Sequence, residues 1–433
     1  MNAEPRILRT QAEETLAAEF QAARTRLAGG PETAARREAA FAAFQKAGLP
    51  HRRVEAWRYT DLRALMRKAA PLAEPGAVPA GLPAVSAFGG ARLVIVDGSY
   101  RPELSDADGL DGVTIRPLAD LLAADDPRVG ASLAALDDPL VALNTALMTG
   151  GVAIDVAPGA SVGRMIELAH VTTGAHATQT RNLVHVGADA SLRLVETHTG
   201  PDGAAYQANG VTEAVIGDRA RVVWAKLQQE GDAALHVGTL ALTAGRETRF
   251  DHLVLMIGAV LSRSQQFVTL SGPEAKIGMN GATMLRGRQH ADIALVVDHT
   301  EPACESRERF KAVVDGEAEA IFQGRIVVKP QAQKTDARMM TQGLLLSEGG
   351  QFSAKPELEI FADDVQCAHG ATSGQIDEDL LFYLLARGIP RPEAETLLVT
   401  AFLAEAIEAL GDETIAAVCE AAATRWLAAR GGA

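Results

Sequence analysis

The sequence is poor in cysteine and in aromatic residues, and it contains no long apolar run and no strongly basic segment. Aromatic residues make up 4% of its 433 residues, and acidic residues outnumber basic ones to give a net charge of −14. Proteins that bind nucleic acids use basic patches, and many also stack bases on aromatic side chains. Because both features are absent, the composition argues against nucleic acid as a partner.

The chain also lacks the signals of a membrane or secreted protein. Its most apolar run, residues 253–261, is well short of the ~20 residues that a transmembrane helix needs. The first residues lead into a polar helical pattern without the apolar core of a signal peptide. The cysteines Cys304, Cys367 and Cys419 are odd in number and widely spaced, which predicts no disulfide framework. We therefore expect a cytoplasmic protein with no membrane contact.

Nucleotide-binding motifs are missing as well. The sequence contains no G-x-x-x-x-G-K-[ST] phosphate loop, and no G-x-G-x-x-G segment opens a helix. Residues 159–163 match the G-x-S-x-G pattern, but that motif needs a helix after it, and a strand pattern follows here. We expect a glycine turn at this position and no nucleotide site in this chain.

What the sequence does contain is a long β-patterned region between helical ends. Residues 11–70 show helical spacing, and residues 71–90 form a predicted linker rich in Pro, Gly and Ala. From about residue 150 to residue 361, short alternating strands are separated by glycine turns about 30 residues apart. One gap of 44 residues is interpreted as two short coils. The turn glycines are Gly187, Gly217, Gly245, Gly272, Gly316 and Gly349.

Strand-only repeats of fixed length indicate a β-solenoid or a sandwich. Because a similar strand–glycine turn–strand segment recurs along the chain, we favour a parallel β-helix. In the C-terminal part, helix-capping and helix-ending residues again indicate helices. Asp377 is expected to cap one helix, and Asp412 the last one. The predicted organisation is an N-terminal helical domain with linker at residues 1–90, a β-helix core at 91–375, and a C-terminal helical domain at 376–433.

A thiol and an imidazole stand two residues apart where the β region ends, at Cys367 and His369. In a strand both side chains would point to the same face, and together they suit iron, iron–sulfur clusters, zinc or copper. Two ligands do not close a metal site. A buried, inert cysteine and a turn-forming His-Gly are the alternative interpretation, whereas a site shared with a partner chain would explain half a ligand set.

The other candidate residues carry weaker signals. His299 and Cys304 are five residues apart across a proline turn, and a structural turn is the simpler interpretation. Cys419 lies among alanines of the last predicted helix and is expected to pack there. The remaining histidines of the β region have no metal-site spacing and are expected to be surface or packed residues. They are His170, His176, His185, His198, His236, His252 and His290.

Several stretches resemble the SufB/SufD family of iron–sulfur cluster assembly proteins, nearly from end to end of the chain. The Cys-x-His-Gly-Ala-Thr form at residues 367–372 resembles the SufD branch, because SufB typically has Glu after the histidine. The stretches that carry the resemblance are residues 55–60, 324–336, 344–347, 355–372 and 382–388.

The resemblance implies a mainly β fold, a right-handed parallel β-helix (solenoid) flanked by N-terminal and C-terminal α-helical domains. It implies a non-catalytic scaffold that forms a heterodimer with a SufB-like paralogue, while a SufC-like ABC ATPase docks on the C-terminal helices. His369 and Cys367 would then lie at the SufB interface, close to a transient iron–sulfur cluster. Cys304 and His299 are weaker candidates for the same role.

Two alternatives remain open at this point. An independent β-helix enzyme acting on polysaccharides would need a carboxylate pair. The adjacent Asp363 and Asp364 would point to opposite faces of a strand, and Glu357 with Glu359 has no aromatic sugar platform nearby. The second alternative is a homodimer that carries or stores a cluster or iron without SufB.

Overall fold

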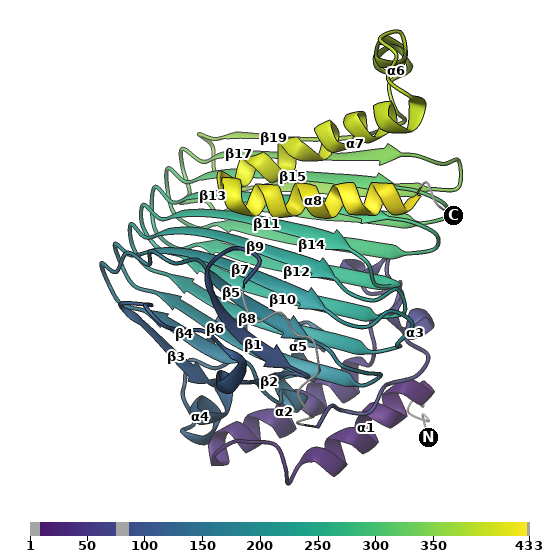
Figure 1. Ribbon diagram of the computed structural model, residues 1–433. Coiled ribbons are helices and arrows are strands. Elements are labelled where there is room, and N and C mark those ends of the chain that lie inside the picture. The colour runs from purple at the N-terminus through teal and green to yellow at the C-terminus, as the bar shows by residue number, and fades with distance from the viewer. Residues whose placement is uncertain (1–8, 75–85, 431–433) are drawn as a thin grey trace, which may run out of the picture.

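The computed structural model describes residues 9–74 and 86–430, and its centre is a parallel β-solenoid made of two facing sheets (Figure 1). From β4 onward, consecutive strands alternate between the sheets, so each coil gives one strand to each sheet. Neighbouring strands within each sheet run parallel except at the N-terminal end, where β1 with β2 and β3 with β4 pair antiparallel. The predicted fold class, a mainly β solenoid with helices at both ends, is confirmed.

The ten-stranded sheet has the order β19-β17-β15-β13-β11-β9-β7-β5-β1-β2. Its strands are β1 (Ala91–Val96), β2 (Ser99–Tyr100), β5 (Ile166–Val171), β7 (Ser191–Thr199), β9 (Arg221–Gln229), β11 (Arg249–Ile257), β13 (Lys276–Leu285), β15 (Glu305–Val314), β17 (Asp336–Leu345) and β19 (Gln366–Gly374).

The nine-stranded sheet has the order β18-β16-β14-β12-β10-β8-β6-β4-β3. Its strands are β3 (Val113–Pro117), β4 (Val152–Val156), β6 (Ala177–Val186), β8 (Gln207–Ile216), β10 (Leu235–Ala244), β12 (Leu261–Leu270), β14 (His290–His299), β16 (Glu319–Val328) and β18 (Gln351–Ile360).

The turn glycines keep successive coils close together. A Cβ on Gly217 would lie 2.7 Å from the backbone nitrogen of Ala188 in the preceding coil, so a larger residue does not fit. Gly217 lies in a turn from the nine-stranded to the ten-stranded sheet, whereas Gly316 lies in a turn of the opposite direction. The gap of 44 residues before Gly316 therefore spans about one and a half coils, and its interpretation as two short coils was wrong.

The N-terminal helices pack on the outer side of the nine-stranded sheet, where their buried cluster includes Val237 of β10 and Leu261 of β12. They are α1 (Gln11–Ala23), α2 (Pro31–Ala47), the 3-10 turn η1 (Glu55–Trp57) and the short α3 (Leu62–Leu65). Thr10 caps α1 in a reciprocal capping box with Glu13. Phe20 and Phe41 stack at 4.0 Å inside this helical cluster. Part of the predicted linker, residues 75–85, lies outside the described residues.

A helical insert within the region expected to be β was missed. It contains α4 (Leu118–Ala123), η3 (Ala131–Leu133) and α5 (Pro139–Leu147). Leu140, Leu143 and Leu147 of α5 belong to the same buried cluster as the N-terminal helices. The insert is short and apolar, so its periodicity is hard to distinguish from that of a buried strand.

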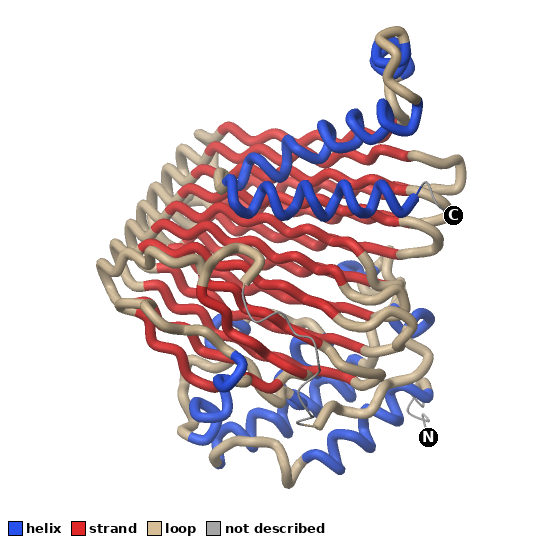
Figure 2. The backbone as a smooth tube through the Cα atoms, viewed as in Figure 1, coloured by secondary structure: helices blue, strands red, loops and turns tan. Residues whose placement is uncertain are grey.

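The C-terminal helices are α6 (Glu378–Leu385), α7 (Arg391–Ile407), η4 (Glu408–Leu410) and α8 (Glu413–Arg430). Helices α7 and α8 lie across the outer face of the ten-stranded sheet, while α6 projects beyond the solenoid (Figures 1 and 2). Cys419 is buried between α8 and this sheet, so its predicted packing role is confirmed. Asp377 caps α6 as expected, its carboxylate accepting from the backbone N–H groups of Asp379 and Leu380.

Among the described residues, no helix combines the length and the apolar character needed to cross a membrane.

Candidate metal-ligating site

Cys367 and His369 lie on β19, the last strand of the ten-stranded sheet, and both face the interior of the solenoid. In the parallel register Cys367 is paired with Ala337 and His369 with Met339, and these two β17 residues belong to the solenoid core. The side chains therefore share one face, as expected for residues i and i+2 of a strand. Cys367 is half-buried against the core and His369 is exposed.

The thiol of Cys367 is protonated when nothing binds it. Burial raises the pKa of this thiol, and the neighbouring carboxylates Asp336 and Glu308 raise it further. A metal ion would reverse the balance, because binding to a metal favours the thiolate over the thiol. The protonated thiol is therefore a poor nucleophile and a poor ligand until a metal ion binds and favours the thiolate.

β19, which carries this pair, and β18 are the last strands of the solenoid among the described residues. Among the described residues, β19 has one strand neighbour, β17, and β18 likewise has only β16. Both strands present a free edge of backbone N–H and C=O groups, a surface that proteins normally cover or pair. Large apolar side chains are also exposed near this end, namely Met340, Ile360 and Phe361.

Glu308 is a member of this region that the sequence analysis missed. It faces inward from β15 and lies in the same row as Met339 and His369. Its side chain is fully buried, and neither carboxylate oxygen accepts a hydrogen bond within the described ranges. Burial raises the pKa of Glu308 to about 8. Glu308 and Met339 are 31 residues apart, and Met339 and His369 are 30 residues apart, which matches the length of one coil. This spacing is the sequence signal that could have placed Glu308 in line with His369.

His299 and Cys304 each have a separate partner. The ring Nε2 of His299 lies 3.0 Å from Ser306 Oγ, and burial lowers the pKa of this imidazole to about 4. The thiol of Cys304 is buried and donates to the Gly272 carbonyl at 3.4 Å, and burial raises its pKa. These contacts are those of a packed turn between β14 and β15.

Three of the four carboxylates weighed for an enzyme form ion pairs, and Glu357 and Glu359 face outward from β18. Glu359 lies 3.3 Å from Arg325, and Glu357 lies 3.3 Å from Lys355. Asp364 is paired with Lys334 in the turn before β19. Each of these carboxylates is matched by a cation on the surface.

Comparison with known families agrees with this geometry. Residues 169–402 match the SUF system FeS cluster assembly, SufBD core domain, and residues 10–72 match the SufBD protein N-terminal region. The chain belongs to the SufBD family. The core match covers more than half of the chain and runs from β5 into α7.

Individual relatives give the same family. The chain is 30% identical over 375 residues to the iron–sulfur cluster assembly protein SufD of Escherichia coli, covering 85% of this chain and 87% of the relative. It is also 30% identical over 380 residues to a SufBD family protein of Synechocystis, covering 83% of both chains. The predicted resemblance to this family, and to SufD within it, is confirmed.

Proposed function

We propose that this protein is a scaffold subunit of a Suf complex that helps to form and transfer nascent iron–sulfur clusters at its interface with a SufB-like paralogue. The observation that carries the proposal is the placement of Cys367 and His369 on the inner face of β19, the last strand of its sheet among the described residues. In this role the chain performs no nucleotide hydrolysis. Iron and sulfide are its cargo and are not a resident cofactor.

The free edges of β18 and β19 give the heterodimer its physical basis. Each strand is nine or ten residues long and can add a strand from a second solenoid through backbone hydrogen bonds. Burying Phe361 and Ile360, which are 59% and 41% exposed, would add apolar contact area. A SufB-like chain with a similar fold presents the same kind of end, so the two solenoids would join end to end.

The partner would also complete the ligand set. One thiolate and one imidazole leave iron with open coordination positions, and structural metal sites generally need four ligands. Ligands from the paralogue would fill these positions while the cluster is assembled. Because the site is divided between two chains, a small movement of the interface would open it for cluster release.

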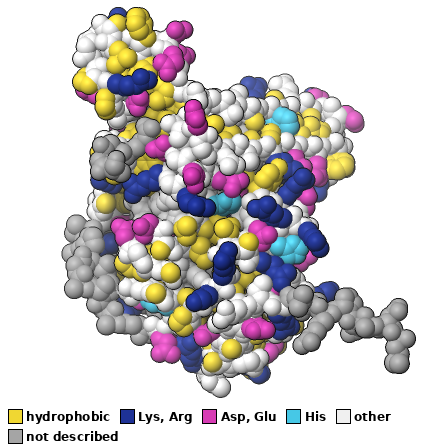
Figure 3. Space-filling view, turned by 90° about the vertical axis from the view of Figure 1, so that its right-hand side faces the viewer, with side chains coloured by type: hydrophobic (Ala, Val, Ile, Leu, Met, Phe, Trp, Pro, Cys, Tyr) yellow, Lys and Arg dark blue, Asp and Glu magenta, His cyan; other side chains and the backbone are white. Residues whose placement is uncertain are grey.

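The C-terminal helices would dock a SufC-like ABC ATPase. Helix α6 projects away from the body, and hydrophobic side chains are exposed on this projecting part among charged ones (Figures 1 and 3). Phe382 is 72% exposed, and Leu380 and Tyr383 are each 53% exposed. ATP-driven dimerisation of two ATPase copies, one on each paralogue, would then pull on the shared interface and expose the ligand groups.

The test is anaerobic co-expression of the protein with its SufB-like and SufC-like partners. We expect His369→Ala or Cys367→Ala complexes to assemble normally but to contain less iron and sulfide and to absorb less visible light. The matched control is His185→Ala, because His185 is an exposed histidine in the early part of the solenoid.

Two outcomes would contradict the proposal. Normal cluster content in both variants would remove the site assignment, and failure of the wild-type chain to join a SufB-like partner would remove the heterodimer. Recovery of the chain only as a homodimer that contains iron or a cluster would favour the alternative in which it stores or carries cargo by itself. Size-exclusion mass with iron analysis separates these outcomes.

A further inference from the structure

The interior of the solenoid is divided into an apolar part and a polar part. Along β7 the inward-facing residues are first Leu192 and Leu194, which belong to the core, and then Glu196 and His198. His170 on β5 continues the polar part in the neighbouring coil. These residues lie far along the sheet from β19, so they are separate from the pair Cys367 and His369.

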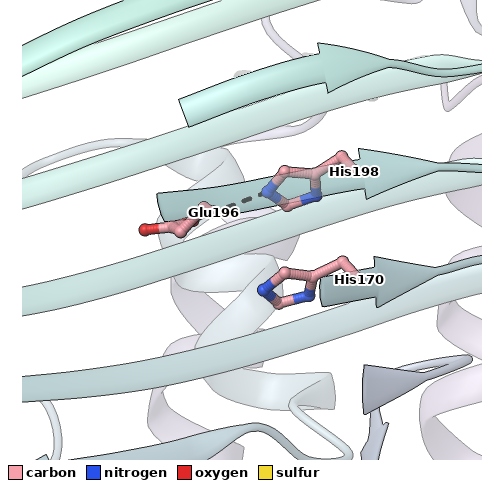
Figure 4. Close-up of side chains that lie close together, drawn as sticks. All are labelled: His170, Glu196 and His198. Carbon is pink, nitrogen blue, oxygen red and sulfur yellow. Dashed lines mark ion pairs between the residues drawn. The ribbon is translucent and has the colours of Figure 1, made fainter. Parts of the chain in front are cut away.

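Two histidines and one glutamate converge in this polar interior. His170 and His198 are direct register partners, and their rings stack with centroids 4.4 Å apart and an angle of 7° between planes. Glu196 Oε2 lies 3.5 Å from His198 Nε2. One ligand atom from each of the three residues lies within 4.8 Å of the others. Figure 4 shows the stacked rings with the carboxylate group beside them.

The cluster has hydrogen-bonding capacity that the described residues do not satisfy. Apart from the 3.5 Å contact of His198 Nε2 with Glu196 Oε2, neither this nitrogen nor the nearby buried Gln228 Oε1 has a hydrogen-bond partner within the ranges described. Buried polar groups in native proteins are nearly always paired, and an exception points to a bound water or ion. His198 is only 6% exposed and its Nε2 atom is buried, so bulk solvent does not supply that partner.

There is room for an ion at the cluster. Two internal voids of about 20 Å³ each adjoin it, and His170 and His198 border both of them. A void of this size holds one water-sized particle. Gly238 on β10 helps to keep the space open, since a Cβ there would lie 2.2 Å from Lys226 Nζ and 3.0 Å from His236 Nε2.

Two acidic side chains and one lysine line the voids. Glu196 and Glu230 are both buried, and Lys226 is the cation whose charge acts on both of them. When all three are ionised, two negative charges face one positive charge. His236 lies edge-on to His198 at 4.9 Å and 2.8 Å from Glu230, which adds an imidazole rather than a fixed charge. The buried carboxyl group of Glu196 can provide an oxygen ligand for a metal ion.

We propose that the solenoid interior holds a divalent transition metal ion on His170, His198 and Glu196. Two imidazoles with one carboxylate form a donor set typical of iron(II), and it also suits zinc(II) and cobalt(II). All three ligands come from this chain, so binding does not require the SufB-like partner. The site is therefore independent of the function proposed above.

The test is anaerobic titration of the purified full-length protein with cobalt(II), followed by visible absorption, and with iron(II), followed by elemental analysis after gel filtration. We expect a single tight equivalent that is retained in the Cys367→Ala/His369→Ala double variant. Glu196→Gln and His198→Gln should bind at least about tenfold more weakly. The control is His185→Gln, which changes an exposed histidine of the same solenoid.

Three results would overturn the proposal. The first is that the double variant binds no metal tightly, and the second is that both Gln variants bind metal as tightly as the wild type. The third is that added metal leaves the melting temperature unchanged, which would show that water alone fills the voids. Circular dichroism checks that the Gln variants fold. If they do not, the double variant still decides the question, because bound metal must raise its melting temperature and a chelator must reverse the rise.

Discussion

Glu308 and His369 lie in one inward-facing row of the ten-stranded sheet, with Met339 between them. The row joins a fully buried carboxyl group to an exposed imidazole at the open end of the solenoid. The pKa of Glu308 is raised to about 8 by burial. The carboxyl group is therefore neutral at neutral pH, and it can release a proton two strands away from His369.

The raised pKa of Glu308 predicts a pH-dependent stability. The folded protein keeps this proton up to about pH 8, whereas the unfolded chain loses it near the ordinary value of 4.5. Unfolding thus releases a proton in this range, so stability falls as pH rises, by roughly 1.4 kcal/mol for each tenfold change in proton concentration. Urea unfolding at pH 5, 6.5 and 8 would measure the slope. Glu308→Gln should flatten it, and an equal slope in both proteins would contradict the assignment.

Much of the fold could be predicted because the coil repeat leaves a mark on the sequence. Glycines such as Gly187 and Gly217 are required where successive coils touch, and alternating strands connect them. Helix α5 could not be recognised, because its leucines are buried by helices more than ninety residues away in sequence. The sequence also could not show which glycine turns lead from the nine-stranded to the ten-stranded sheet and which lead back, because both kinds of turn have similar sequences.

The candidate sites were predictable only where the ligands are neighbours in sequence. Cys367 and His369 are two residues apart, so a strand places them together without knowledge of the fold. His170 and His198 are 28 residues apart and meet only because adjacent coils stack in register. The coil repeat contained that information, but the exact register depends on turn lengths that vary between coils.

The different burial of the three cysteines predicts selective alkylation. Cys304 and Cys419 are fully buried, and burial raises the pKa of Cys419 to about 12, so neither should react in the folded protein. Cys367 is half-buried and should react slowly at pH 8. Mass spectrometry after iodoacetamide treatment should find one labelled cysteine, and Cys367→Ser should abolish the labelling. Fast labelling of Cys304 in the native state would contradict this arrangement.

Arg263 and Asp292 are expected to anchor the N-terminal helices to the solenoid. They form a buried ion pair, Arg263 donates to the Ala56 carbonyl at 2.6 Å, and its guanidinium lies 3.9 Å from the Trp57 ring centre. Removing one partner of a buried pair costs about 3–5 kcal/mol. Arg263→Ala should therefore lower the free energy of unfolding by that amount and expose Trp57, which fluorescence would detect.

The matched control for this ion pair is Arg219→Ala. Arg219 forms an exposed pair with Asp189 at 2.7 Å between coils of the same solenoid. Exposed ion pairs contribute little to stability, so this variant should unfold like the wild type. If Arg263→Ala and Arg219→Ala behaved alike, the buried pair would not be the anchor. Limited proteolysis after residue 57 would show independently whether the N-terminal helices have detached.

Helix α6 offers a way to separate partner docking from folding. Phe382 is 72% exposed and Leu380 is 53% exposed, whereas Leu381 on the same helix is buried. Phe382→Glu removes apolar docking surface without disturbing the core, so the melting temperature should stay unchanged while the SufC-like ATPase no longer co-purifies. Leu381→Glu, in contrast, places a charge in a buried position and should lower stability as well. An acidic side chain at the centre of an apolar contact would be desolvated without a partner, so Phe382→Glu should prevent docking. If the ATPase still co-purified normally with this variant, α6 would not be the docking surface.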